Sequence, residues 1–167
     1  LFDATEAPAG EFPLVLEAGA GGILVHEAMG HGFEADFIRK GTSIFSGRLG
    51  QRCAPDFVSI FDTGIRSDDR GSLAIDDEGA PAQETFLVRD GVLESWMHDH
   101  ISARHFGLAS TGNGRRQDYQ NLPLPRMRST CIAVGPHERD QIIASTKRGI
   151  YASQFANGQV NIGQGDF

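Results

Sequence analysis

The chain has 167 residues, which suits one domain or a large part of one, and its 40% hydrophobic and 22% charged residues are typical of a globular protein. A formal net charge of −7 argues against direct nucleic-acid binding, because phosphate contacts require an excess of lysine and arginine. No apolar run approaches the ~20 residues that span a bilayer, so we expect no membrane partner.

The cysteine count and the first residues bear on where the protein works. Two cysteines, Cys53 and Cys131, are too few for a disulfide scaffold and indicate a reducing, cytoplasmic compartment, in which both thiols are inert. The opening "LFDATEAPAGEF" has neither an initiator methionine nor the basic and apolar segments of a signal peptide. We therefore expect residues 1–167 to form a single domain that is truncated at both ends.

The first half of the chain predicts short elements separated by glycine. Residues 12–17 are typical of a strand, and residues 22–37 predict a helix with apolar positions such as Ile23, Met29 and Phe33. Two further apolar runs, 57–61 ("FVSIF") and 72–75 ("SLAI"), predict strands.

The second half contains the clearest turn signals. Residues 84–97 predict a hairpin around Asp90-Gly91, a pair that accepts the positive φ angles of a type I′ turn. Residues 129–134 predict a strand, 137–149 a helix that stops at Gly149, and 150–165 a hairpin around Asn157-Gly158. The predicted fold class is α+β, with a largely antiparallel, curved, barrel-like sheet and a helix near the start of the chain.

That helix contains the segment "HEAMGH", in which His26 and His31 are five residues apart. Zinc peptidases commonly use H-E-x-x-H, whose histidines are four apart and share one helical face. On a regular helix a five-residue step leaves the imidazoles about 140° apart, so they cannot bind one ion. A π-bulge would bring them together, and Gly30 and Gly32 flank the second histidine where a helix would widen or end. The alternative is one buried, hydrogen-bonded histidine and one histidine in solvent.

Longer motifs resemble the TldD/PmbA family, also called modulators of DNA gyrase, which are metalloproteases. The resemblance rests on "HEAMGHGFEADFIRKGTSIFSGRLG", "GSLAIDDEGAPAQETFLVRDGVLESWMHD", "TGNGRRQDYQNLPLPRMRST" and "GIYASQFANGQVNIGQGDF", which together cover most of the chain. It implies that the chain is part of the family's C-terminal metalloprotease domain. Because H-E-x-x-x-H is retained, the chain is similar to the TldD-type subunit.

The resemblance implies a zinc-dependent peptidase that acts on small or unfolded peptides. His26 and His31 would be zinc ligands and Glu27 the general base. The partner would be a TldE/PmbA-type subunit, or a second copy in a dimer. The chemistry suits these residue types, since neutral imidazoles bind zinc and a neighbouring carboxylate can take a proton from water. Glu34, three residues after His31, is either a hydrogen-bond partner of that imidazole or a solvated acid.

A catalytic zinc site needs about three protein ligands. In the family the third is a cysteine from a Gly-Cys segment, expected downstream of Phe167, so this form is expected to be metal-free or partly occupied, and inactive. Neither cysteine present is assigned to the site. The cluster "MHDHISARH" contains His98 and His100, which are interpreted first as polar residues that lead into a helix, with metal binding in place of the missing ligand or substrate contact as the other possibilities.

Residues 111–128 form a predicted loop rich in glycine, asparagine and proline, with Arg115, Arg116, Arg126 and Arg128. It would shape the substrate cleft, where Arg115 and Arg116 are candidates to hold a peptide carboxylate. The alternative is that the arginines pair with acids such as those at 76–78. Two hypotheses for the protein follow: the catalytic half of a zinc peptidase, or a non-catalytic regulatory domain with structural histidines.

Overall fold

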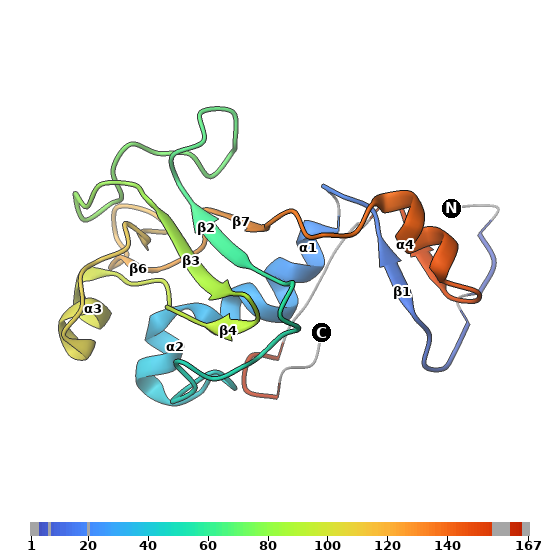
Figure 1. The fold of residues 1–167 in the computed structure, drawn as a ribbon. Helices are drawn as coiled ribbons and strands as arrows, with labels where there is room; N and C mark the ends of the chain where they lie inside the picture. The colour runs from blue at the N-terminus through green and yellow to red at the C-terminus, as the bar shows by residue number, and fades with distance from the viewer. Residues whose placement is uncertain (1–3, 7, 20, 155–160, 165–167) are drawn as a thin grey trace.

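The computed structural model describes residues 4–6, 8–19, 21–154 and 161–164. A larger body contains a sheet with helices packed against it, and a smaller part with β1, α4 and β8 lies beside it (Figure 1). The elements are β1 (Leu14–Leu16), α1 (Gly22–Val25), a π-helical turn (His26–Gly30), a 3₁₀ turn (His31–Phe33), α2 (Ala35–Lys40), β2 (Ile60–Thr63), β3 (Glu84–Arg89), β4 (Val92–Leu93), α3 (His100–Phe106), β5 (Gly114–Arg115), β6 (Leu124–Pro125), β7 (Ser129–Ile132), α4 (Arg139–Ser145) and β8 (Ile150–Ala152).

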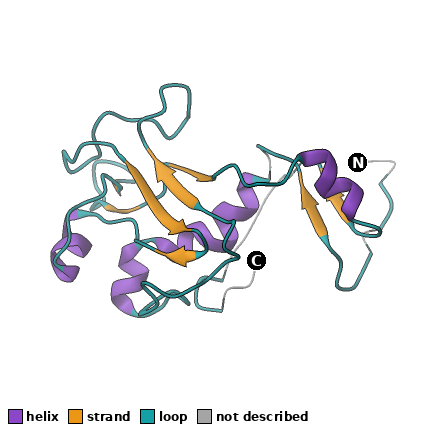
Figure 2. Ribbon diagram, in the orientation of Figure 1, coloured by secondary structure: helices purple, strands orange, loops and turns teal. Residues whose placement is uncertain are grey.

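The main sheet has four strands in the order β4-β3-β2-β7, and all its pairings are antiparallel (Figure 2). The β3–β4 hairpin is the predicted one: Asp90 has φ 48° and Gly91 has φ 78°, as a type I′ turn requires. Asp62 of β2 is buried in this sheet, where it accepts hydrogen bonds from the backbone N–H of Arg128 at 3.0 Å and the Thr130 hydroxyl at 2.9 Å.

The core lies between this sheet and the helical segment 22–40. Phe33, Leu87 and Met97 are fully buried, and each contributes on the order of 1.5–3 kcal/mol by leaving water. The segment that follows β4 bonds to the helical segment through the backbone, since Ala35 N–H donates to Met97 O at 3.0 Å and Met97 N–H donates to Phe33 O at 2.9 Å. These contacts hold the helical segment in one position against the sheet.

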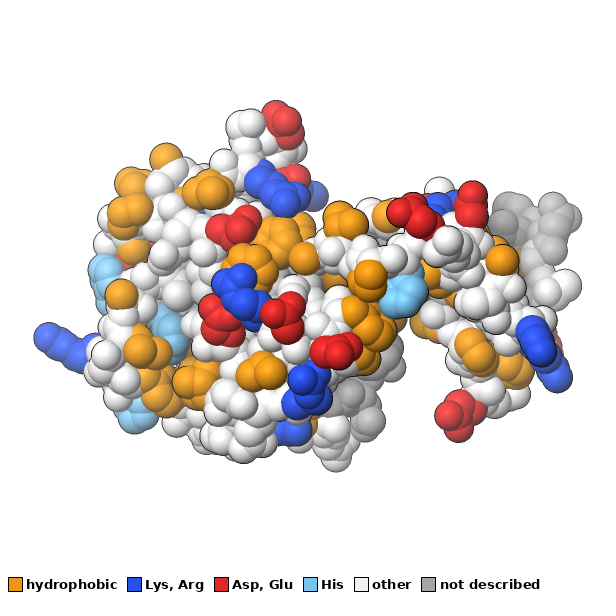
Figure 3. Space-filling view, in the orientation of Figure 1, with side chains coloured by type: hydrophobic (Ala, Val, Ile, Leu, Met, Phe, Trp, Pro, Cys, Tyr) orange, Lys and Arg blue, Asp and Glu red, His pale blue; other side chains and the backbone are white. Residues whose placement is uncertain are grey.

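The smaller part is built differently. β1 and β8 pair in parallel, with Val15 opposite Tyr151, and α4 buries none of its residues. The outline of the molecule narrows between this part and the main body (Figure 3). Within the described part of the chain, no helix is long and apolar enough to cross a membrane.

The α+β class with a largely antiparallel sheet is confirmed, but the barrel-like closure is wrong for the described residues. Their strands form an open four-stranded sheet and two separate pairs, β1–β8 and β5–β6. The predicted strand 72–75 is also wrong, because only a single bridge joins Ile75 to Pro81. Asp76 accepts the N–H groups of Glu78 and Ala80 and so closes a turn at that point.

Several predicted boundaries shift. The strand expected at 57–61 occupies Ile60–Thr63, because Asp62 and Thr63 are buried in the sheet despite being polar. The helix expected to reach Gly149 ends at Ser145. β8 starts at the expected place but pairs with β1, and the predicted turn at Asn157-Gly158 lies outside the described residues.

Candidate metal centre

The helical segment widens by one residue between the two histidines. His26–Gly30 is a π-helical turn, and His31 N–H donates to the carbonyl of His26. A five-residue step completes one π turn, so both imidazoles lie on the same face. Their ring centroids are 4.7 Å apart and the rings meet edge to face, at 87°. The π-bulge predicted from the spacing is therefore confirmed.

The glycines beside His31 serve a different purpose from the one expected. Neither Gly30 nor Gly32 has a positive φ, and Gly30 keeps ordinary helical angles at φ −54° and ψ −53°. A Cβ on Gly30 would overlap the Met127 sulfur, and one on Gly32 would lie 2.8 Å from the Phe45 ring. These residues are glycine because neighbouring side chains pack directly against their backbone, and the backbone itself is not strained.

Glu27 joins the two histidines in one group of potential ligands. One ligand atom from each of His26, Glu27 and His31 lies within 4.8 Å of the others. Two imidazoles and a carboxylate are donors that zinc accepts. Ligand atoms bound to one zinc ion lie about 2.0–2.2 Å from it, so they are slightly closer to one another than these three atoms are. The two imidazoles therefore fit a zinc ion after small side-chain rotations, with the Glu27 carboxylate beside it.

The buried carboxylate of Glu34 lies beside the His31 ring. Nδ1 of His31 lies 3.2 Å from Oε2 of Glu34, whose side chain is only 1% exposed. The same oxygen accepts a hydrogen bond from Nη1 of Arg126 at 3.2 Å, and Arg126 also lies 3.6 Å from Asp36. A carboxylate that accepts a hydrogen bond from Nδ1 fixes the ring orientation and leaves Nε2 free to bind a metal.

The two imidazoles have different electrostatic surroundings. The hydrogen bond to Glu34 raises the pKa of His31, whereas burial and the neighbouring imidazole lower the pKa of His26. Burial raises the pKa of Glu34, against the opposing effects of His31 and Arg126. A metal requires both rings in their neutral form, so ion binding would release a proton where a ring is charged.

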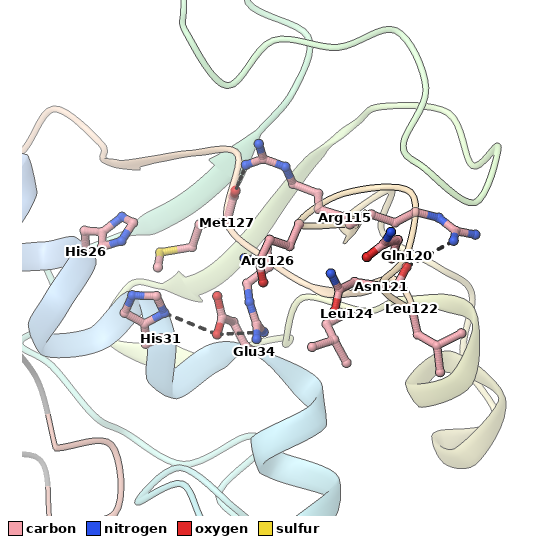
Figure 4. A pocket seen from close by; sticks show the side chains of 12 residues that line it. His26, His31, Glu34, Arg115, Gln120, Asn121, Leu122, Leu124, Arg126 and Met127 are labelled. Atoms are coloured by element: carbon pink, nitrogen blue, oxygen red, sulfur yellow. Dashed lines mark hydrogen bonds and ion pairs between the residues drawn. The ribbon is translucent and has the colours of Figure 1, made fainter.

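A cleft of about 710 Å³ opens in front of the histidines, within the size range of small-molecule sites (Figure 4). The helical segment contributes His26, His31 and Glu34 to its lining. β5 contributes Arg115, and the loop between β5 and β6 contributes Arg116, Gln117, Gln120, Asn121 and Leu122. Leu124, Arg126 and Met127 complete it. In Figure 4 the histidines lie at one end, Gln120 and Leu122 at the other, and Arg126 and Met127 between them.

The predicted cleft residues divide into two groups. Arg115 and Arg116 line the cleft as the sequence indicated. His98 and His100 do not. His98 is 1% exposed, packs beside Trp96 and Phe106, and has Nδ1 3.3 Å from the Ser102 hydroxyl. Because His98 is buried in the core, the interpretation that it contacts substrate is wrong. His100 is exposed and donates its backbone N–H to Glu78 at the start of α3.

The cysteines are outside the candidate site. Neither belongs to the group of His26, Glu27 and His31, and both are free and half-buried. Burial raises the pKa of each thiol, in keeping with the expectation that they are inert.

Two features of the site had no signal in the sequence. Arg126 pairs with Glu34, 92 positions earlier in the chain, rather than with the acids at 76–78. Met127 covers Gly30 and lines the cleft, although nothing around it indicates an exposed or functional position. Both contacts depend on how the loop folds back over the helix.

Comparison with known proteins places this arrangement in a family. A profile described as the PmbA/TldA metallopeptidase C-terminal domain matches residues 9–167. The chain belongs to this metallopeptidase family. The metalloprotease TldD homolog of Haemophilus influenzae is 49% identical over 164 residues, which is 98% of this chain and 34% of that protein. This chain therefore spans about a third of that relative's length.

Solved structures of the family have the same fold. A candidate modulator of a DNA gyrase from Thermotoga maritima superposes with a TM-score of 0.75 at 25% identity, covering 92% of this chain and 34% of that one. TldE from Thermococcus kodakarensis superposes with a TM-score of 0.74 at 24% identity, covering 90% of this chain and 34% of that one. The metalloprotease name of the bacterial relative implies a metal in that protein.

Proposed function

We propose that this chain carries the catalytic site of a zinc-dependent peptidase that hydrolyses small or unfolded peptides. The observation that carries the proposal is the π-helical turn, which places His26 and His31 on one face with Glu27 between them at the edge of a cleft. Membership of a metallopeptidase family supports the reaction class.

The residues take distinct roles in this proposal. His26 and His31 hold the zinc, and Glu34 keeps the His31 ring oriented through Nδ1. Zinc, when bound, polarises the scissile carbonyl and lowers the pKa of water toward ~7. Glu27 accepts a proton from the attacking water and donates it to the leaving amine. The half-buried position of Glu27 keeps its carboxylate at the edge of the site.

The second hypothesis, a regulatory domain with structural histidines, fits the geometry less well. A structural histidine is normally buried and hydrogen-bonded. The His26 side chain is 45% exposed, and its ring comes no nearer than 4.0 Å to the Glu27 carboxylate. Among the described residues, no hydrogen bond anchors that ring. The alternative of one hydrogen-bonded and one solvent histidine describes His31 and His26 separately, but it gives no reason for a π-helical turn that brings both rings to one face, whereas a metal site does.

Two further parts of the proposal concern what lies outside this chain. The resemblance implies a thiolate from a Gly-Cys segment downstream of residue 167 as the third zinc ligand. The match to a TldE structure supports pairing with a TldE/PmbA-type subunit, with a dimer of identical chains as the other arrangement. We further propose a cytoplasmic location, in keeping with two free thiols.

The Glu27→Gln substitution tests the role of the base in the full-length protein that carries this chain. Glutamine keeps the size and hydrogen bonding of the side chain but cannot take a proton. Zinc content by elemental analysis should stay the same, while peptide hydrolysis should fall roughly 10²–10⁴-fold. Loss of zinc together with activity would make Glu27 a ligand, and unchanged activity would refute the mechanism.

A further inference from the structure

The cleft contains two arginine side chains that are held by uncharged groups. Arg115 donates from Nη1 to the Met127 carbonyl at 2.9 Å, and Arg116 donates from Nη1 to the Asn121 carbonyl at 3.1 Å. Within the described part of the chain, neither guanidinium has a carboxylate oxygen within 4.0 Å. Arg126 differs, because it pairs with Glu34. Two positive charges therefore line the cleft without a neutralising partner among these residues.

The nearby acids are engaged with the backbone of the loop. Asp77 accepts the backbone N–H of Arg116 at 2.7 Å. Asp118 closes a turn by accepting the N–H of Gln120 at 2.8 Å and the side-chain amide of Asn121 at 2.7 Å. These carboxylates fix the shape of the loop, so the guanidinium groups are already positioned before any ligand arrives. Binding then costs little side-chain ordering.

We propose that Arg115 and Arg116 form a carboxylate subsite along the cleft wall, each at its own position, so that the cleft favours peptides that carry a carboxylate close to the cleaved bond. This inference rests on the peptidase function proposed above. Guanidinium groups match the planar geometry of a carboxylate and bind it through two parallel hydrogen bonds. The carboxylate is either the C-terminus of the peptide or an acidic side chain.

The position of the subsite gives it a role in selecting the bond. The arginines and the histidines line the same cleft, and in Figure 4 the loop residues Gln120 and Leu122 lie at the far end from His26 and His31. In Figure 4 Arg115 extends toward Met127, nearer the histidines, whereas Arg116 donates to the Asn121 carbonyl, nearer the far end. A carboxylate held at either position would place a peptide bond at a set distance from it against the histidines. The amides of Gln117, Gln120 and Asn121 line the same cleft and would contact the peptide backbone.

Binding of uncut peptides tests the proposal. The full-length Glu27→Gln protein is titrated by calorimetry with acetylated penta-alanine as the free acid, as the C-terminal amide, and as the amide with glutamate at the last position. We expect at least one peptide with a carboxylate to bind about 10- to 100-fold more tightly than the alanine amide. Preference for the free acid alone assigns the C-terminus, and preference for the glutamate peptide assigns a side chain. Equal affinity of all three peptides would overturn the proposal.

Substitutions then locate the carboxylate. In Arg115→Gln/Arg116→Gln the preference should fall below about twofold, while Arg116→Lys, which keeps the charge, should retain part of it. If the double variant does not fold, the single variant Arg116→Gln is tested in its place, because Arg116 is exposed. Arg104→Gln removes an exposed arginine of α3 outside the cleft lining and should change nothing.

The outcomes separate this inference from the peptidase proposal. A preference that survives in the double variant would assign the carboxylate to another group and overturn the subsite. Absence of hydrolysis by the unsubstituted protein would instead refute the peptidase function and leave the binding comparison valid, because the binding assay uses a variant that does not need to cleave.

Discussion

Glu34 connects the histidine pair to the loop that forms the other wall of the cleft. Its Oε2 is shared between His31 Nδ1 and Arg126 Nη1, at 3.2 Å each. The residue itself sits at a break in the helical segment, with ψ 120°, where the chain passes from the 3₁₀ turn into α2. The break lets the Glu34 side chain face the preceding turn and reach the ring of His31.

Replacing this carboxylate should weaken zinc binding without removing a ligand. In Glu34→Gln the neutral amide accepts the Nδ1–H bond more weakly, so His31 is a poorer donor and its ring is less fixed. Loss of such a partner typically costs about 10- to 100-fold in metal affinity. Titration of the full-length protein against a competing chelator measures the change. The control is Asp36→Asn, which removes another buried carboxylate near Arg126 without contact to His31. Equal losses in both variants would show a general charge effect.

Close packing around Gly32 leaves no room for a side chain, so a substitution at this position should lower the stability of the protein. An alanine Cβ would lie 2.8 Å from two atoms of the Phe45 ring, which is buried and stacks on Phe33 with centroids 4.4 Å apart. Because a ring in the core cannot move aside freely, Gly32→Ala should destabilise the protein by about 1–3 kcal/mol in denaturant unfolding.

The matched control lies in the same helical segment. A Cβ on Gly22 would meet no neighbouring atom within 4 Å, and the residue has no positive φ, so Gly22→Ala should be neutral or slightly stabilising. If the two variants unfolded at the same denaturant concentration, close packing would not be the reason for glycine at position 32.

At the level of the elements, local signals were predictable and long-range pairings were not. The β3–β4 hairpin follows from Asp90-Gly91, and the π turn follows from the spacing of His26 and His31, because both depend on adjacent residues. The pairing of β1 with β8 joins segments more than 130 residues apart. No local pattern specifies it, and the hairpin predicted around Asn157-Gly158 lies outside the described residues.

The candidate site shows the same contrast between local signals, which were predictable, and long-range contacts, which were not. His26, Glu27 and His31 lie within one helical turn. The spacing raised a shared site for the two histidines, and the family resemblance gave Glu27 its role as the base. The loop with Arg115 and Arg116 was placed at the cleft from its composition. The burial of His98 was missed, because the polar residues of "MHDHISARH" suggest exposure, although Asp99 and Ser102 are buried as well. Tertiary packing against Trp96 and Phe106 decides its environment.

The buried imidazole before α3 should make stability depend on pH. Asp99 caps this helix by accepting the N–H of Ser102 at 2.7 Å, and His98 lies directly before the cap. Burial lowers the pKa of His98 from 6.5 to about 4, against a smaller opposing effect of Asp99. The native state therefore binds a proton less readily than the unfolded chain. The resulting stabilisation is present above pH 6.5 and is lost as the pH falls through about 4, a change on the order of 3 kcal/mol.

Comparison of variants separates the contribution of His98 to the pH dependence of stability from the contribution of acidic residues that titrate in the same pH range. Unfolding free energies measured between pH 7 and 4 should fall less steeply in His98→Gln than in the unsubstituted protein. His105→Gln, at an exposed position of the same helix, is the control and should keep the original slope. A His98→Gln variant with an unchanged slope would show that the imidazole is already accessible to protons.

At the level of the whole molecule, the two parts differ in how they are held together. The main body has a continuous core that includes Phe33, Leu87 and Met97. In the smaller part, α4 has seven residues, none of them buried, and among the described residues β1 pairs only with β8. Isolated helices of this length and two-stranded pairs are marginally stable in water. The chain spans about a third of the length of the Haemophilus relative, which therefore has residues beyond the matching part.

Hydrogen exchange should therefore separate the two parts in the isolated 167-residue chain. Backbone amides of β1, α4 and β8 should exchange at least about tenfold faster than those of β2 and β3, because few buried contacts must break to expose them. The β2–β3 amides in the same sample serve as the internal control. In a longer protein that carries this chain, we expect protection of the smaller part to rise while that of β2 and β3 stays the same. Equal protection of both parts in the isolated chain would mean that the smaller part is stable by its own contacts, and that no further segment is needed to hold it.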